Sequence, residues 1–308
     1  MRKIKRVDHT VKPFISLGTA QFGLDYGITN KNGKLTRLSI QKILTRALDE
    51  GISSLDTAYS YGNAEGLIGD IGGSIKSNCF RVTSKIKRQE TDAITEVDIK
   101  RLDREIFESL NRLKIQQFDT LLLHSTEDLR KPGSELLEGW LKGLKDRGHT
   151  KRIGVSIYAE REVKGIDIGL LDVIQAPVSL YDQRLIKSKG IRELTAAGTR
   201  IQGRSIFLQG LIVTPSQEWP QWAPKEIIEH HKSLEVFAKA KNISLHDCAI
   251  RFATSQSWLE SIVVGVCNQD ELEELITGWR NVPEIKDDEW SCWELNDSSI
   301  IDPRLWPL

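Results

Sequence analysis

The hydrophobic positions of this chain follow two alternating patterns. Short apolar runs rich in β-branched residues recur along the sequence, and each is followed by a longer segment with apolar residues at helical spacing. The short runs predict buried strands, and the longer segments predict amphipathic helices. The predicted strands are Phe14–Leu17, Ile52–Asp56, Phe80–Ser84, Phe118–Leu123, Arg152–Ser156, Leu171–Gln175, Thr199–Gln202 and Ser261–Val264.

The first long helical segment shows how the helix boundaries are set. Ile40, Ile43 and Leu44 share one face, Thr36 precedes them as a start signal, and Gly51 follows as a stop. Glycines also follow most of the later helical segments, which is typical of helix-to-strand loops in a parallel sheet. The predicted helices are Ser39–Gly51, Asp98–Leu113, Ser134–Arg147, Gln183–Ala197 and Gln269–Thr277.

The repeated order of strand and helix predicts the fold class. Eight such units in about 270 residues match the stride of a (β/α)8 TIM barrel. A doubly wound open sheet is the alternative, but no GxGxxG motif follows the first predicted strand. We therefore expect a single α/β barrel domain over residues 1–308, with a C-terminal tail from about residue 280 packed on or near the barrel.

The composition excludes several classes of protein. Lys and Arg number 43, as do Asp and Glu, so no general attraction to nucleic acid or anionic membranes is expected. No apolar run approaches the roughly 20 residues of a membrane span, and the basic N-terminal segment lacks the apolar stretch of a secretory signal. No zinc-type spacing occurs. The cysteines form no CxxC motif, which predicts a reduced, cytoplasmic protein; they are Cys79, Cys248, Cys267 and Cys292.

Polar and ionisable residues follow the ends of consecutive predicted strands. Taken singly, an Asp at such a place often caps a helix, a Lys is often solvated and a His is often structural. In a barrel, however, the carboxyl ends of all strands meet at one rim, where active sites lie. We therefore expect one shared site containing Asp56, Tyr59, Tyr61, Glu65, Lys85, His124, Ser156 and Gln175.

Four of these side chains form a plausible proton-delivery system. An ammonium beside a phenol stabilises the phenolate, and a carboxylate beside the ammonium keeps it charged and oriented. An imidazole positions a carbonyl oxygen by donating a hydrogen bond to it. Tyr61, Lys85, Asp56 and His124 together would protonate an alkoxide as it forms, which is the acid catalysis that accompanies hydride transfer.

The same segments carry a resemblance to a known family. LDTAYSYGNAE, TSK and LLLH, with LGTAQFG near the start and VVGVCNQDELEEL near the end, resemble the aldo-keto reductase superfamily of NAD(P)-dependent oxidoreductases on a (β/α)8 barrel. The resemblance implies Tyr61 as the catalytic acid, Asp56 and Lys85 as its partners and His124 as the residue that orients the substrate. Tyr59 falls at a variable position of the motif and is assigned to packing.

The resemblance also implies a cofactor, because the family binds its nicotinamide dinucleotide extended across the barrel mouth. NADPH is the family default, and NADH is the alternative. The substrate would be a small carbonyl or sugar-like molecule, whereas the oligomeric state and the direction of reaction are not readable. The implied cofactor-binding residues are Gly18, Thr19, Asp56, Ser156, Gln175, Arg204, Ser205, Phe207, Gly210, Gly265, Cys267, Glu271 and Glu274.

Three departures from the family pattern bear on the cofactor and the substrate. Ile157 replaces an Asn that usually binds the carboxamide, and Arg204 replaces an aromatic residue that many members stack on the nicotinamide. A planar guanidinium either stacks or binds an anion. The segment from Gly265 to Leu275 is acidic and lacks Arg or Lys, so it would repel the 2′-phosphate of NADPH.

These departures leave a second hypothesis open, namely a cofactor-binding sensor or regulatory protein with little turnover. A barrel with lyase or isomerase chemistry would leave the four side chains unexplained. The segment after the seventh strand contains Trp219 and Trp222, which would either cover the mouth of the barrel or pack against its exterior.

Overall fold

The fold is an eight-stranded parallel barrel surrounded by helices. A computed structural model describes residues 12–27, 33–73, 80–281 and 289–307. Each strand pairs in parallel with its sequence neighbours, and β1 pairs with β8, which closes the cylinder and rules out an open sheet. All eight predicted strands are present: β1 (Phe14–Gly18), β2 (Ser54–Asp56), β3 (Arg81–Ile86), β4 (Phe118–Leu123), β5 (Thr150–Ser156), β6 (Val173–Pro177), β7 (Arg200–Arg204) and β8 (Leu259–Gly265).

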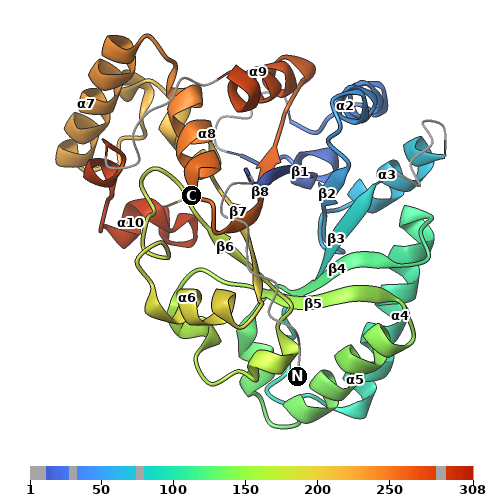
Figure 1. Ribbon diagram of the computed structural model, residues 1–308. Helices are drawn as coiled ribbons and strands as arrows, with labels where there is room; N and C mark the ends of the chain where they lie inside the picture. Colours follow the sequence, from blue (N-terminus) through green and yellow to red (C-terminus); the bar gives the residue numbers. More distant parts are fainter. Residues whose placement is uncertain (1–11, 28–32, 74–79, 282–288, 308) are drawn as a thin grey trace.

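The helices of the described residues form an outer layer (Figure 1). Their apolar faces pack against the strands, as the helical spacing predicts. The α-helices are α1 (Ala20–Gly23), α2 (Arg37–Asp49), α3 (Ala64–Gly72), α4 (Glu96–Leu113), α5 (Ser134–Asp146), α6 (Lys189–Ala196), α7 (Lys225–Lys241), α8 (Leu245–Ser255), α9 (Gln269–Asn281) and α10 (Ser298–Ile301).

Side-chain caps explain where several helices begin. The Thr36 hydroxyl accepts the backbone N–H of Ser39 at 3.2 Å, which confirms the predicted start signal of α2. Thr95 and Asp98 form a reciprocal capping box at the start of α4. Gly51 follows α2 with a φ of +78°, a conformation that favours glycine.

Several helical segments differ from the prediction. The helix predicted from Gln183 begins only at Lys189, because the Ser188 hydroxyl caps Ile191 N–H at 2.9 Å. The Gln183 side chain instead donates to two backbone carbonyls. The connection between β5 and β6 holds two short 3₁₀ helices rather than an α-helix, and two helices not specified in advance, α7 and α8, lie between β7 and β8.

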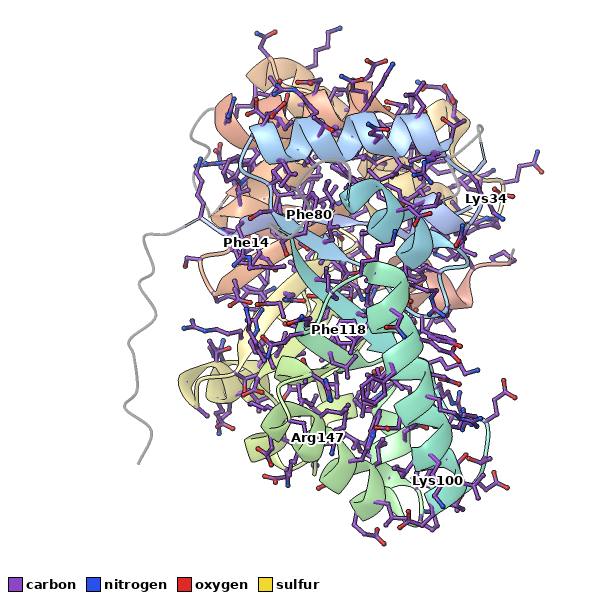
Figure 2. The ribbon with its side chains drawn as sticks, turned by 90° about the vertical axis from the view of Figure 1, so that its right-hand side faces the viewer. Phe14, Lys34, Phe80, Lys100, Phe118 and Arg147 are labelled. Atoms are coloured by element: carbon purple, nitrogen blue, oxygen red, sulfur yellow. The ribbon has the colours of Figure 1, made fainter. Side chains whose placement is uncertain are left out.

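The two ends of the barrel are well separated. Figure 2 places Phe14, the first residue of β1, on the side opposite Lys34, which comes after β1. The adjacent strands are in register at the carboxyl end, where Gly18 of β1 pairs with Asp56 of β2 and with Gly265 of β8. This register brings the predicted site residues to the same level of the cylinder.

The described part of the C-terminal tail packs on the barrel beside α7 and α8 (Figure 1). Trp290 is 2% exposed, and its carbonyl oxygen accepts a hydrogen bond from the Gln183 side chain at 2.8 Å. Leu295 N–H donates to the carbonyl oxygen of Tyr181 at 2.9 Å. No helix in the described ranges is long and apolar enough to span a bilayer.

Candidate active site

A pocket of about 850 Å³ opens at the carboxyl ends of the strands. It is lined by all the residues predicted to act in catalysis or cofactor binding, from the catalytic four to Glu271 and Glu274. Its volume lies in the upper part of the range of about 300–1,000 Å³ for ligand pockets. The pocket therefore has the size for an extended cofactor together with a small substrate, while the individual roles remain predictions.

A buried ion pair lies at the end of the pocket that holds Tyr61, Lys85 and His124, which we call the catalytic end. The ammonium of Lys85, on β3, donates to Asp56 Oδ1 and to the carbonyl oxygen of Thr57, the latter at 3.0 Å. Gln175 Nε2, on β6, donates to the second carboxylate oxygen of Asp56 at 2.6 Å. Because charged groups need partners when they lose water, these contacts hold both side chains in fixed positions.

The ammonium is kept protonated despite its burial. Desolvation lowers the pKa of Lys85, but the Asp56 carboxylate and the Tyr61 phenol together outweigh it, so the pKa is raised overall. Lys85 Nζ lies 5.2 Å from the centroid of the Tyr61 ring. A fixed positive charge therefore sits beside the candidate proton donor.

Two glycines hold Tyr61 in place. A Cβ on Gly23 would lie 1.9 Å from the carbonyl oxygen of Tyr61, and a Cβ on Gly62 would lie 2.5 Å from that of Gly23. Gly62 also has a φ of +54°, where residues with a Cβ are strained. The turn that carries Tyr61 thus rests directly on the backbone of α1.

His124 follows β4 and is open to the pocket. Its backbone N–H donates to the Ile86 carbonyl at 2.9 Å. Desolvation by the surrounding protein, followed by the charges of Lys85 and Arg204, lowers the pKa of His124 to about 4. The ring is therefore neutral near pH 7, and it has one N–H with which to orient a carbonyl oxygen.

The predicted carboxamide ligands lie beside this cluster. Ser156 and Gln175 are paired across β5 and β6 and are both buried. The Gln175 amide already donates to Asp56, so this residue also orients the carboxylate, a role that the sequence did not predict. Thr19 donates its hydroxyl to the Asp56 carbonyl at 3.0 Å.

The far end of the pocket is acidic. The Glu271 carboxylate accepts the backbone N–H of Cys267 at 2.7 Å and thereby orders the start of α9. Phe207 stacks on His246 with ring centroids 4.3 Å apart, and Glu274 lines the same region. Desolvation and then Glu271 raise the pKa of Cys267 to about 11, so this thiol is not a nucleophile near neutral pH.

Two residues that the sequence placed at the end of β2 have side chains that lie away from the pocket. Glu65 is buried behind β3, where it accepts hydrogen bonds from Ser84 and Ser109 and pairs with Arg112 of α4. Tyr59 donates to Glu108 of α4 at 3.0 Å, as the packing assignment predicts. Neither residue lines the large pocket.

Sequence reasoning missed several pocket residues that lie outside the strands: Tyr26 and Tyr158 on loops, and His246 in the first turn of α8. Tyr26 and Tyr158 line the catalytic end, and His246 lines the far end. Tyr158 lies only two positions after Ser156, so its distance from a strand end was a usable signal. Tyr26 and His246 occur where no strand pattern marks the site.

The segment after β7 covers one side of the mouth through residues other than its tryptophans. Pro215, Glu218 and Pro220 line the pocket. Trp219 is buried and donates from its indole to the Thr214 carbonyl at 3.1 Å, and Trp222 packs against Trp306. The tryptophans therefore anchor the segment to the protein.

Comparison with known proteins decides the family. The family model described as Aldo/keto reductase family matches residues 14–295. The chain belongs to this family. It is 24% identical over 291 residues to D-arabinose 1-dehydrogenase of Saccharomyces cerevisiae, a match covering 87% of this chain and 85% of that protein. An aldo-keto reductase of Mycolicibacterium paratuberculosis is 28% identical over 158 residues, which cover 50% of this chain and 47% of that protein.

The fold is also found in a solved relative. An aldo-keto reductase from Bacillus halodurans, solved in its holo form, aligns with a TM-score of 0.70 and 15% identity over 95% of both chains. The protein is therefore an oxidoreductase of the aldo/keto reductase family, whose members generally use NAD(P)H. Neither the family nor these relatives favour the regulatory alternative.

Proposed function

We propose that the protein transfers a hydride between a nicotinamide dinucleotide and a carbonyl or alcohol carbon, with Tyr61 as the general acid and base. The observation that carries this proposal is the buried Lys85–Asp56 pair, with its ammonium beside the Tyr61 ring. A structural ion pair alone would not need a phenol and a neutral imidazole open to the same pocket.

The geometry divides the reaction among the side chains. When bound, a reduced nicotinamide supplies the hydride that adds to the carbonyl carbon. The Tyr61 hydroxyl gives its proton to the carbonyl oxygen, and the Lys85 ammonium stabilises the negative charge that remains on the phenol oxygen. His124 orients the carbonyl oxygen through its single ring N–H, and Asp56 keeps Lys85 in place.

Substitution of the phenol tests this assignment. Tyr61→Phe removes the proton donor and leaves the ring, so we expect kcat to fall by about 100-fold or more while cofactor affinity stays unchanged. Turnover followed by absorbance of the reduced cofactor, with affinity from fluorescence titration, gives both values. Near-normal turnover would eliminate Tyr61 as the acid, and tight cofactor binding by a wild-type protein inactive on every carbonyl tested would favour the sensor hypothesis.

The charges along the pocket bear on the choice of cofactor. Among the described residues, its only lining cations are Lys85 and Arg204, whereas Glu271 and Glu274 lie at the far end. If the adenosine lies there, as the resemblance implies, a 2′-phosphate meets carboxylates and no cation. We propose that NADH binds more tightly than the family default, NADPH.

Parallel titrations with NADH and NADPH test the preference. We expect NADH to bind at least 10-fold more tightly, and Glu274→Gln to narrow the difference by weakening the repulsion. Raising the salt concentration should also reduce the difference in affinity between NADH and NADPH, because salt screens exposed charges. Tighter binding of NADPH by the wild-type protein would contradict the proposed preference.

One relative supports a small substrate of the sugar type. The yeast relative is named for the oxidation of D-arabinose, and we propose a related carbonyl or alcohol for this chain. A reducing, cytoplasmic environment remains our proposal. The described cysteines are free, whereas Cys79 and the basic N-terminal segment lie outside the described residues.

A further inference from the structure

Arg204 ends β7 at the catalytic end of the pocket and has no ion-pair partner among the residues that the structure describes. Its guanidinium donates to the Ser205 hydroxyl at 3.2 Å and to the Ile157 carbonyl at 3.1 Å, and both acceptors are neutral. None of the ion pairs within the described part of the chain includes Arg204, although such pairs are numerous elsewhere. A half-buried cation in this position has unused hydrogen-bond donors, since guanidinium has five.

A neighbouring arginine shows the contrast. The ring of Tyr158 contacts two guanidinium groups, with Arg204 Cζ at 4.2 Å and Arg304 Cζ at 3.6 Å from the ring centroid. Arg304 is held by Asp302, with 2.6 Å between Nη2 and Oδ2, and lies outside the pocket lining. Tyr158 therefore fixes the position of both cations, but within the described ranges only Arg204 faces the pocket and is without a carboxylate partner.

The charge balance of the catalytic end leaves one positive charge. Lys85 and Asp56 compensate each other. His124 is neutral near pH 7, because its pKa is about 4. Desolvation raises the pKa of Tyr26 to about 12, so that phenol is neutral as well. The positive charge of Arg204 is what remains for a ligand.

The direction of the side chain separates it from the acidic far end. Arg204 reaches across the end of β6 to the carbonyl of Ile157, which follows β5, whereas Glu271 and Glu274 follow β8 on the other side of β7. His124 and Lys85 are both close enough to be affected by its charge. The guanidinium thus lies among the groups that surround the reacting carbonyl.

We propose that Arg204 binds an anionic group of the substrate, so that the enzyme acts on carbonyl compounds, or the matching alcohols, that bear a carboxylate or a phosphate near the reacting carbon. This inference rests on the proposed function. A guanidinium suits both anions, because its planar fork forms paired hydrogen bonds with two oxygens. The substrate would then differ in charge from neutral D-arabinose, for which the yeast relative is named.

Matched aldehydes test the proposal. One pair is 4-carboxybenzaldehyde and its neutral methyl ester, and the other is glyceraldehyde 3-phosphate and neutral glyceraldehyde. We expect the wild-type enzyme to prefer at least one anion over its neutral partner by about 10- to 100-fold in kcat/KM, as for a hydrogen bond between charged groups. The pair that shows the preference distinguishes a carboxylate from a phosphate.

Three variants test whether Arg204 causes the preference. Arg204→Gln should remove the preference for the anion mainly by raising the KM of the anionic aldehyde. The kcat/KM of its neutral partner and the Kd of the cofactor should change less than about threefold. Arg204→Lys should restore part of it, since a point charge remains without the planar fork. Arg304→Gln, which alters the other cation on Tyr158, should keep the preference.

Several results would overturn the proposal. These are equal rates for both members of each pair in the wild-type enzyme, an equal loss for both members in Arg204→Gln, or a loss of cofactor affinity in that variant. The last result would assign the guanidinium to the pyrophosphate. If no aldehyde is reduced, the proposed function fails. The affinities of 4-(hydroxymethyl)benzoate and its methyl ester then test the role of Arg204 separately. Tighter binding of the anion that depends on Arg204 supports the inference, and equal binding of the two compounds refutes it.

Discussion

At the residue scale, the chemistry of this site depends on which charges are compensated. Lys85 is fully enclosed and keeps its proton because Asp56 lies against it, and Asp56 is held in turn by Gln175. His124 faces the opposite situation, since desolvation by the surrounding protein and two nearby cations lower its pKa and favour its neutral form. The same cluster therefore presents a fixed cation, a neutral imidazole and a phenol to one pocket.

The neutral state of His124 makes stability depend on pH. Its pKa in the folded protein is about 4, below its ordinary value of 6.5, so between these values the unfolded chain binds this proton more readily. The stabilisation from neutral His124 is thus present above about pH 6.5 and is lost as the pH falls toward 4. We expect the melting temperature of the wild type to decrease more than that of His124→Gln from pH 7.5 to 4.5.

Thermal unfolding of both proteins across that range measures the difference. Identical pH dependence would show that His124 titrates alike in the folded and unfolded chain.

At the element scale, close backbone contacts position the turn that carries Tyr61. The strand ends were predictable from the apolar runs, because buried parallel strands have few polar residues. The contact between α1 and the Tyr61–Gly62 turn was not, since it joins segments that are distant in sequence. Likewise, Gln183 has the helical spacing of its neighbours but donates instead to the Leu180 and Trp290 carbonyls, which delays α6.

Substitution of Gly62 tests the role of this contact. Gly62→Ala introduces a Cβ at 2.5 Å from the Gly23 carbonyl and strains a φ of +54°. We expect the free energy of unfolding to fall by about 1–3 kcal/mol and kcat to fall as Tyr61 moves. Denaturant unfolding and steady-state kinetics report the two effects.

Gly139 provides a matched control. It lies on the exposed face of α5, and a Cβ there meets nothing within 4 Å. Gly139→Ala should stabilise the helix by up to about 1 kcal/mol and leave kcat unchanged. If both alanine variants behave alike, the contact between α1 and the turn is not needed to hold Tyr61.

At the scale of the whole molecule, the C-terminal tail completes the outer layer. Trp290 is 2% exposed and packs near Phe237 and Phe252, with ring centroids 6.3 and 6.2 Å apart. The tail also brings Arg304 to Tyr158 at the edge of the mouth. It therefore links the side of the barrel that holds α7 and α8 to the catalytic end.

Removal of this tryptophan tests how far the tail stabilises the barrel. Trp290→Ala should lower the free energy of unfolding by about 3–5 kcal/mol, because it leaves a large cavity in a packed region. Leu305→Ala, at a position 57% exposed, should change it by less than about 0.5 kcal/mol. Urea titrations of both variants give the comparison, and a small effect of Trp290→Ala would show that the tail is only peripherally attached.

The sequence by itself determined the eight strands and their parallel order, and it marked Asp56, Tyr61, Lys85 and His124 as candidates for one shared site, because alternating hydrophobic patterns and strand ends are local features. It also flagged Arg204 as an unusual residue. Only the tertiary structure decided that Glu65 faces α4, that Gln175 holds Asp56, and that Arg304 has a carboxylate partner whereas Arg204 meets none among the described side chains. These outcomes depend on which distant side chains meet when the cylinder closes, and side-chain direction across strands is not encoded in the spacing of one strand.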